Sequence, residues 1–101
     1  MNVRQLRATI QKRMQEGQFD QAIPLSVNLI EQLGSKATFE DWFANGVCHF
    51  KLDQNTEAVE SYNKALALDS KNFQAMANKG ISLLRLDRVD EAFRSFREAF
   101  S

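Results

Sequence analysis

The sequence predicts an all-α protein built from a helical hairpin that recurs along the chain. Apolar residues recur at steps of three and four residues in segments of about a dozen residues, and no segment alternates strictly between apolar and polar. The phrase EAVESYNKAL at 57–66 also returns as EAFRSFREAF at 91–100, at an offset of 34 residues. A helical phrase that returns at a fixed offset is typical of repeat architectures.

Six helices are expected, because five short polar segments interrupt the apolar periodicity. These segments lie around Gly17 and at 33–38, 52–55, 68–72 and 86–90. Gly34 stands where a helix that ends in a left-handed residue favours glycine. Thr38, followed three residues later by Asp41, is typical of a capping box at the start of the next helix. Pro24, the only proline, can be accommodated if its helix begins near Phe19.

Composition and charge exclude several classes of protein. A chain of 101 residues, 44% hydrophobic and 26% charged, is typical of a single compact domain spanning 1–101. Thirteen basic and thirteen acidic side chains cancel, so no overall field favours nucleic acid or an anionic membrane. Cys48 is the only cysteine, which excludes an internal disulfide and a thiolate metal cluster. The start MNVRQLRATIQKR lacks the apolar core of a signal peptide or membrane anchor, so a cytoplasmic location is expected.

Residue size also recurs at the same offset. The matching pairs are Trp42 with Met76, Gly46 with Gly80, His49 with Leu83, Ala58 with Ala92, Tyr62 with Phe96, and Ala65 with Ala99. A small residue that faces a large one lets two antiparallel helices approach closely. We therefore expect each unit to be a helical hairpin, with Trp42 filling the space beside Gly46 and Ala58.

This pattern resembles the tetratricopeptide repeat, whose unit has an aromatic, a glycine and a large residue on its first helix, then alanine, aromatic and alanine on its second. The residues that carry the resemblance are Trp42, Gly46, His49, Ala58, Tyr62 and Ala65. The chain departs from the family at Asn45 and Lys79, where leucine is usual, and at Ser70, where proline is usual. A degenerate first copy, with two additional residues near Ala37, is visible as Leu6, Ile10, Gly17, Phe19, Ala22 and Leu29.

The resemblance implies an α-solenoid of three repeats, at approximately 3–36, 39–72 and 73–101, stacked into a right-handed superhelix. The first helix of each repeat would line a concave groove, and its residues would be Arg4, Arg7, Gln11, Met14, Glu40, Phe43, Val47, Phe50, Lys51, Gln74, Asn78, Ile81, Leu84 and Arg85. The expected function is a non-enzymatic scaffold, without a cofactor, that binds a peptide or helix of a partner protein in this groove.

The groove residues also favour one kind of ligand. The cations Arg4, Arg7, Lys51 and Arg85 outnumber Glu40, which predicts an acidic, amphipathic partner segment.

A subset of the family grips the carboxylate terminus of chaperone tails with lysine, asparagine and arginine. The corresponding residues here are Arg7, Gln11, Ala44, Gln74 and Asn78. Only Arg7 is positively charged, whereas that contact needs several charge-assisted hydrogen bonds, so the sequence disfavours this ligand.

Phe43, Val47 and Phe50 form a helical stripe displaced by one residue from the stripe of Trp42 and Gly46. This helix is therefore apolar over an unusually wide arc. Two interpretations stay open: the displaced stripe packs against neighbouring repeats, or it presents apolar surface in the groove.

Other candidate sites are weak. Cys48 and His49 point about 100° apart on a helix and have no further ligands, so both are expected in the core. The acidic runs NTEAVE and DRVDEAF stand at helix starts, where they complement the macrodipole. The basic face of the first helix lacks interleaved aromatics for nucleic-acid stacking. Because no phosphate loop, metalloprotease spacing or nucleophile elbow occurs, no enzymatic activity is expected.

A self-assembling structural module is the alternative function. Helical repeat stacks usually need a polar capping element, and none follows the last repeat. Phe93 and Phe100 correspond to Val59 and Leu66, which should pack against the next repeat. We therefore expect weak homodimerisation through Phe93 and Phe100, or a longer natural chain that covers them.

Overall fold

The computed structural model describes the whole chain, Met1 to Ser101, and contains six α-helices and no strand. The elements are α1 (Val3–Gln15), α2 (Phe19–Leu33), the short 3-10 helix η1 (Gly34–Lys36), α3 (Phe39–Lys51), α4 (Asn55–Leu68), α5 (Phe73–Arg85) and α6 (Val89–Ala99). The predicted all-α helical repeat is confirmed.

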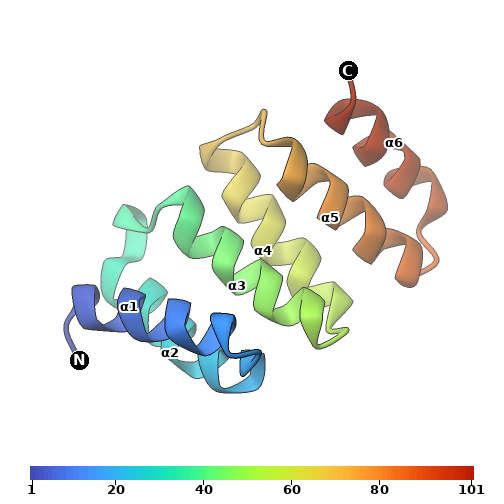
Figure 1. Cartoon of the computed structure of the whole chain (residues 1–101). Coiled ribbons are helices and arrows are strands. Elements are labelled where there is room, and N and C mark those ends of the chain that lie inside the picture. Colours follow the sequence, from blue (N-terminus) through green and yellow to red (C-terminus); the bar gives the residue numbers. More distant parts are fainter.

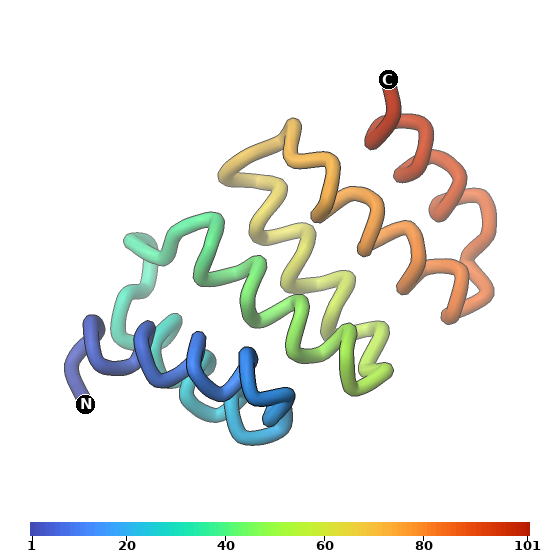
Figure 2. The backbone as a smooth tube through the Cα atoms, viewed as in Figure 1, coloured from blue at the N-terminus to red at the C-terminus, as the bar shows by residue number.

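Consecutive helices pair into three hairpins, and each hairpin packs on the next through the contacts of α2 with α3 and of α4 with α5. Helices α1, α3 and α5 form one layer, and α2 and α4 lie behind them (Figure 1). The stack is elongated, 41 × 24 × 19 Å, with the two termini at opposite ends (Figure 2). No helix combines the length and apolarity that crossing a membrane requires.

All three hairpins turn in the same way. Gly17, Asp53 and Asp87 each have a positive φ, of 74°, 59° and 60°. The next residue's amide then donates to a carbonyl five residues earlier, in the pairs Gln18 to Arg13, Gln54 to His49 and Arg88 to Leu83, each at 2.8 Å. Aspartate tolerates the left-handed conformation better than most residues, which explains why glycine is not needed in the later turns.

The start of α3 is fixed by the predicted capping box, which is confirmed. The Thr38 hydroxyl accepts from the amide of Asp41 at 3.3 Å, and the Asp41 carboxylate accepts from the amide of Thr38 at 3.0 Å. The two bonds satisfy amides that a helix start leaves without intrahelical partners.

The expected role of Trp42 is wrong, because a different aromatic ring faces the glycine. A Cβ atom on Gly46 would lie 2.7 Å from Cε1 of Tyr62, and one on Gly80 would lie 2.7 Å from Cε1 of Phe96. The ring on the second helix of the hairpin therefore rests directly on the glycine of the first. Trp42 is only half-buried and lines a surface cleft beside α2 and α4.

Asn45, one of the departures from the family pattern, is buried in a polar network. Its Nδ2 donates to Oγ of Ser26 at 3.0 Å, and Oγ of Ser61 donates to its Oδ1. The three side chains come from α3, α2 and α4, and all are buried. The network joins the first two hairpins by hydrogen bonds where leucine would supply apolar packing.

Replacing Tyr62 tests the contact on which the second hairpin depends. We expect Tyr62→Ala to lower the free energy of unfolding by about 3–5 kcal/mol, because removing a buried ring leaves a cavity. Tyr62→Phe removes only the hydroxyl that accepts from Asn78, and should cost about 0.5–1.5 kcal/mol. Urea denaturation measures both, and a loss below about 1 kcal/mol for Tyr62→Ala would contradict this packing.

Candidate functional site

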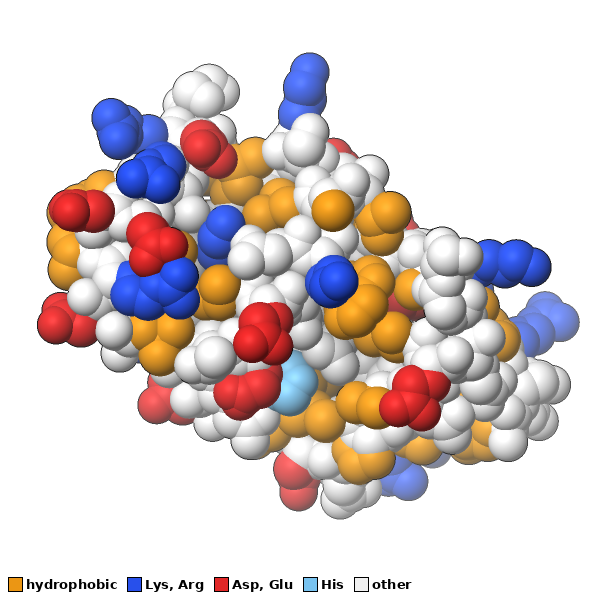
Figure 3. All heavy atoms as spheres, turned by 180° about the vertical axis from the view of Figure 1, so that it is seen from behind, with side chains coloured by type: hydrophobic (Ala, Val, Ile, Leu, Met, Phe, Trp, Pro, Cys, Tyr) orange, Lys and Arg blue, Asp and Glu red, His pale blue; other side chains and the backbone are white.

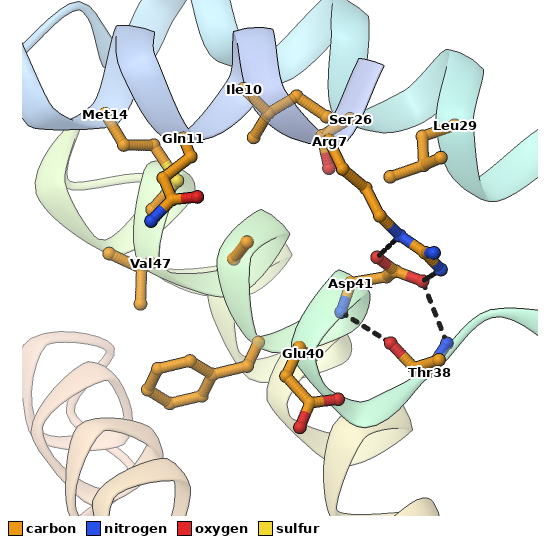
Figure 4. Close-up of a pocket in the computed structure, with 12 residues that line it drawn as sticks. Arg7, Ile10, Gln11, Met14, Ser26, Leu29, Thr38, Glu40, Asp41 and Val47 are labelled. Atoms are coloured by element: carbon orange, nitrogen blue, oxygen red, sulfur yellow. Dashed lines mark hydrogen bonds and ion pairs between the residues drawn. The ribbon is translucent and has the colours of Figure 1, made fainter. Parts of the chain in front are cut away.

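A cavity of about 720 Å³ lies between the first and second hairpins, on the surface that α1 and α3 share (Figure 4). Six of its twelve lining residues are hydrophobic: Ile10, Met14, Leu29, Phe43, Ala44 and Val47. The polar lining residues stand mainly on one side, around the start of α3. The cavity therefore offers an apolar floor with polar groups at its edge.

The cavity gathers part of the expected groove. Six of the fourteen groove residues line it, namely Arg7, Gln11, Met14, Glu40, Phe43 and Val47. The other eight do not: Arg4, Phe50, Lys51, Gln74, Asn78, Ile81, Leu84 and Arg85. Of these, Ile81 is half-buried and Leu84 is 42% exposed, so α5 also carries accessible apolar surface.

Arg7 and Asp41 form a two-pronged ion pair across the seam between α1 and α3 (Figure 4). The distances are 3.0 Å from Nε to Oδ1 and 2.8 Å from Nη2 to Oδ2. Burial alone would raise the pKa of Asp41, but the hydrogen bonds from Arg7 and Thr38 outweigh burial and hold that pKa below its ordinary value. The carboxylate of Asp41 therefore neutralises the charge of Arg7 within the folded chain. The sequence indicated Asp41 only as a helix cap and missed this pair.

The apolar stripe on α3 serves both of the roles left open by the sequence. Phe43, Val47 and Phe50 are half-buried and pack against the buried cluster of Ala58, Tyr62 and Ala75. The ring centroids of Phe43 and Phe50 lie 5.8 Å and 6.4 Å from that of Tyr62. Phe43 and Val47 also line the cavity, so the same side chains connect the core to the open surface.

Arg85, the last residue of α5, contacts residues at the end of α3 and in the turn that follows it. Its guanidinium carbon lies 4.5 Å from the centroid of the Phe50 ring, a cation–π contact. Its Nη1 is 3.7 Å from Oδ1 of Asp53 and also donates to the carbonyl of Phe50 at 3.4 Å. The side chains of Arg85 and Asp53 are both well exposed, so the ion pair between them contributes little to the stability of the fold.

Cys48 and His49 do not share an environment. Cys48 is fully buried, and burial raises the pKa of its thiol to about 11, so it stays protonated and unreactive near neutral pH. His49 is half-buried, and its Nδ1 lies 2.7 Å from Oε1 of Gln54. The core assignment is therefore right for Cys48 and wrong for His49. No group of three histidine, cysteine or acidic side chains is placed to hold a metal ion.

The ion pair at the cavity edge predicts a pH-dependent stability. Because the pKa of Asp41 is lowered in the folded state, its contribution is present above the unfolded value of about 3.9 and is lost as pH falls through the lower folded value. We expect Asp41→Asn to cost about 1–2 kcal/mol at pH 7, limited by the exposure of Arg7. The difference from the parent should shrink below about pH 4.

Urea denaturation across this pH range measures the difference. The matched control is Glu40→Gln, an exposed neighbour without an ion pair, which should change the stability by less than about 0.5 kcal/mol. A penalty for Asp41→Asn that stays constant down to about pH 2.5 would show that the ion pair is not its cause.

Comparisons with known proteins agree with the helical repeat. The family model described as TPR repeat matches residues 48–87. The chain is 28% identical to peptidyl-prolyl cis-trans isomerase FKBP4 of Bos taurus, over 82% of the chain and 21% of that protein. It is 34% identical to Protein SGT1 homolog of Oryza sativa subsp. japonica, over 82% of the chain and 22% of that protein. The chain thus spans about a fifth of the length of these two relatives.

The family match covers the end of α3, all of α4 and all of α5, and so includes the seam between the second and third hairpins. Two pairs that recur at an offset of 34, Gly46 with Gly80 and Tyr62 with Phe96, make equivalent contacts in these two hairpins. Residues 48–87 thus match a tetratricopeptide repeat, and repeats of this family are typically non-enzymatic modules for protein–protein interaction.

Proposed function

We propose that the chain binds a peptide segment or helix of a partner protein along the surface formed by α1, α3 and α5. The cavity of about 720 Å³ carries this proposal, because its volume lies within the range of about 300–1,000 Å³ typical of ligand pockets. A large apolar side chain of the partner would enter between Met14 and Val47, which stand on opposite walls (Figure 4). Burying one such side chain contributes about 1.5–3 kcal/mol.

The charges of the groove residues outside the cavity support an acidic flank on the partner. Arg4 and Lys51 are exposed and have no carboxylate within ion-pair distance, and Arg85 has only the exposed Asp53. Glu40 is the one acid among the fourteen predicted groove residues. With Arg7 neutralised by Asp41, the remaining groove charges still sum to a positive value. An amphipathic segment with acidic residues beside its apolar anchor fits this distribution.

The proposed partner is not expected to bind through a free C-terminal carboxylate. Among the five positions that correspond to the chaperone-tail contact, only Arg7 is charged, and its guanidinium already binds Asp41 through two hydrogen bonds. A ligand carboxylate would have to displace a partner held at 2.8 Å and 3.0 Å. Apolar anchoring together with long-range attraction is therefore the proposed basis of binding.

Neutralising the unpaired groove cations tests this proposal. Pools of peptides that share an amphipathic pattern but differ in charge sign should bind in the order acidic, neutral, basic. Arg4→Gln with Lys51→Gln should weaken the acidic pool about three- to tenfold, and added salt should weaken it in the parent. Fluorescence anisotropy of labelled peptides measures the affinities.

Lys12→Gln with Lys71→Gln removes the same charge from exposed positions outside the groove and serves as the matched control. Preferential binding of the basic pool, or equal losses in the two double variants, would reject the proposed ligand.

Self-association through α6 is the second candidate function. Phe93 is 57% exposed and Phe100 is 75% exposed, whereas Val59, the counterpart of Phe93, is 5% exposed against the following hairpin. Two phenylalanines can each bury about 150–250 Å², so a two-fold pair of ends would bury about 600–1,000 Å² in all. That area is below the roughly 1,200 Å² of a stable interface, so we propose a weak homodimer.

Light scattering on the parent and on Phe93→Glu with Phe100→Glu tests the second candidate. The parent should show an apparent molar mass that rises with concentration up to about 1 mM, and the double variant should stay monomeric, because charged residues at the contact oppose association. A parent that remains monomeric throughout, or a variant that associates equally, removes this face as a contact.

A further inference from the structure

A second cleft, of about 300 Å³, lies where α2, α3 and α4 meet. It lies on the face opposite to the groove. Figure 3 shows this opposite face, where red acidic side chains lie beside the pale-blue imidazole of the only histidine. We propose that this cleft binds an arginine side chain of a partner protein. Its volume is at the lower end of the range for ligand pockets and suits one long side chain rather than a helix.

The wall of the cleft supplies an aromatic face. Trp42 lines it and is half-buried, so part of the indole stays accessible. A guanidinium stacks on an indole face through cation–π attraction, which is strongest for tryptophan. The chain already makes one contact of this kind, between Arg85 and Phe50.

The charge of the cleft favours a cation. Glu31, Glu57 and Glu60 line it together with a single cation, Lys64. The three ion pairs of the chain all lie elsewhere, so none of these carboxylates has a cationic partner within 4 Å. Neighbouring carboxylates without a counter-charge attract a cation and repel an anionic ligand.

The cleft is also lined by a buried hydroxyl, which could accept a further hydrogen bond. Ser61 is 5% exposed and lines the cleft, and its hydroxyl donates its only proton to Oδ1 of Asn45. No group of the protein donates to Ser61 Oγ, so its acceptor positions are unused. The guanidinium carries five N–H donors in a planar fork, so it can donate to this hydroxyl while it stacks on Trp42. Lysine has no planar face to stack, which distinguishes it from arginine here.

This cleft is independent of the proposed groove. The cleft and the cavity share no lining residue, and the exposed groove cations Arg4 and Lys51 line neither of them. A basic peptide that the groove repels is therefore the right probe for the cleft.

Trp42 is the only tryptophan, so its intrinsic fluorescence reports directly on the cleft. The probe is a blocked eight-residue peptide with two arginines among glycine and serine, and its control carries citrulline, the neutral isostere, in place of arginine. We expect a saturable change in Trp42 emission with the arginine peptide and at least about tenfold weaker binding of the citrulline peptide. The lysine version should bind about three- to tenfold more weakly than the arginine peptide.

Glu57→Gln with Glu60→Gln should weaken the arginine peptide about fivefold or more. The charge-matched control, Glu16→Gln with Glu98→Gln, removes two exposed carboxylates outside the cleft and should leave binding unchanged. No saturable emission change, equal binding of the citrulline peptide, or equal losses in the two double variants would overturn the assignment. Binding of an acidic peptide in the groove would be unaffected by any of these results.

Discussion

The contact between an aromatic ring and a glycine inside one hairpin is the constraint on which the stack depends. Tyr62 rests on Gly46 and Phe96 on Gly80, at separations that leave no room for a Cβ atom. The glycine lets the two helices approach until the ring fills the space between them, and this fixes how far apart they lie. The phenylalanines and Val47 on α3 then pack against the same ring and the helix that follows.

The sequence predicts the fold correctly, but it does not predict which large side chain contacts which glycine. A fixed offset with matching residue sizes predicts hairpins, because size complementarity is a property of each repeat. It does not say which large residue meets which small one, and the assignment of Trp42 to Gly46 was wrong for that reason. Residues 42 and 62 both satisfy the pattern, and only the crossing of α3 and α4 decides that Tyr62 reaches the glycine.

The candidate site was less predictable than the fold. Helix periodicity predicts that Arg7, Phe43 and Val47 share the faces of α1 and α3 that line the cavity. It cannot reveal that Arg7 is neutralised, because Asp41 lies 34 residues away and has a sufficient local role in the capping box. The hydrogen bonds of Asn45 are equally invisible to local rules, since Ser26 and Ser61 reach it from two other helices. Contacts between distant segments determine the chemistry of this surface.

The irregular first hairpin gives a physical reason for the location of the cavity. Allowing for the two additional residues near Ala37, Ser26 occupies the position that Tyr62 and Phe96 hold in the later hairpins. A serine cannot fill the volume of an aromatic ring, and Ser26 lines the cavity and bonds Asn45. Leucine at position 45 would leave the Ser26 hydroxyl buried without its donor, which is costly. The departures from the repeat pattern at positions 26 and 45 therefore depend on one another, and together they keep open space between the first two hairpins.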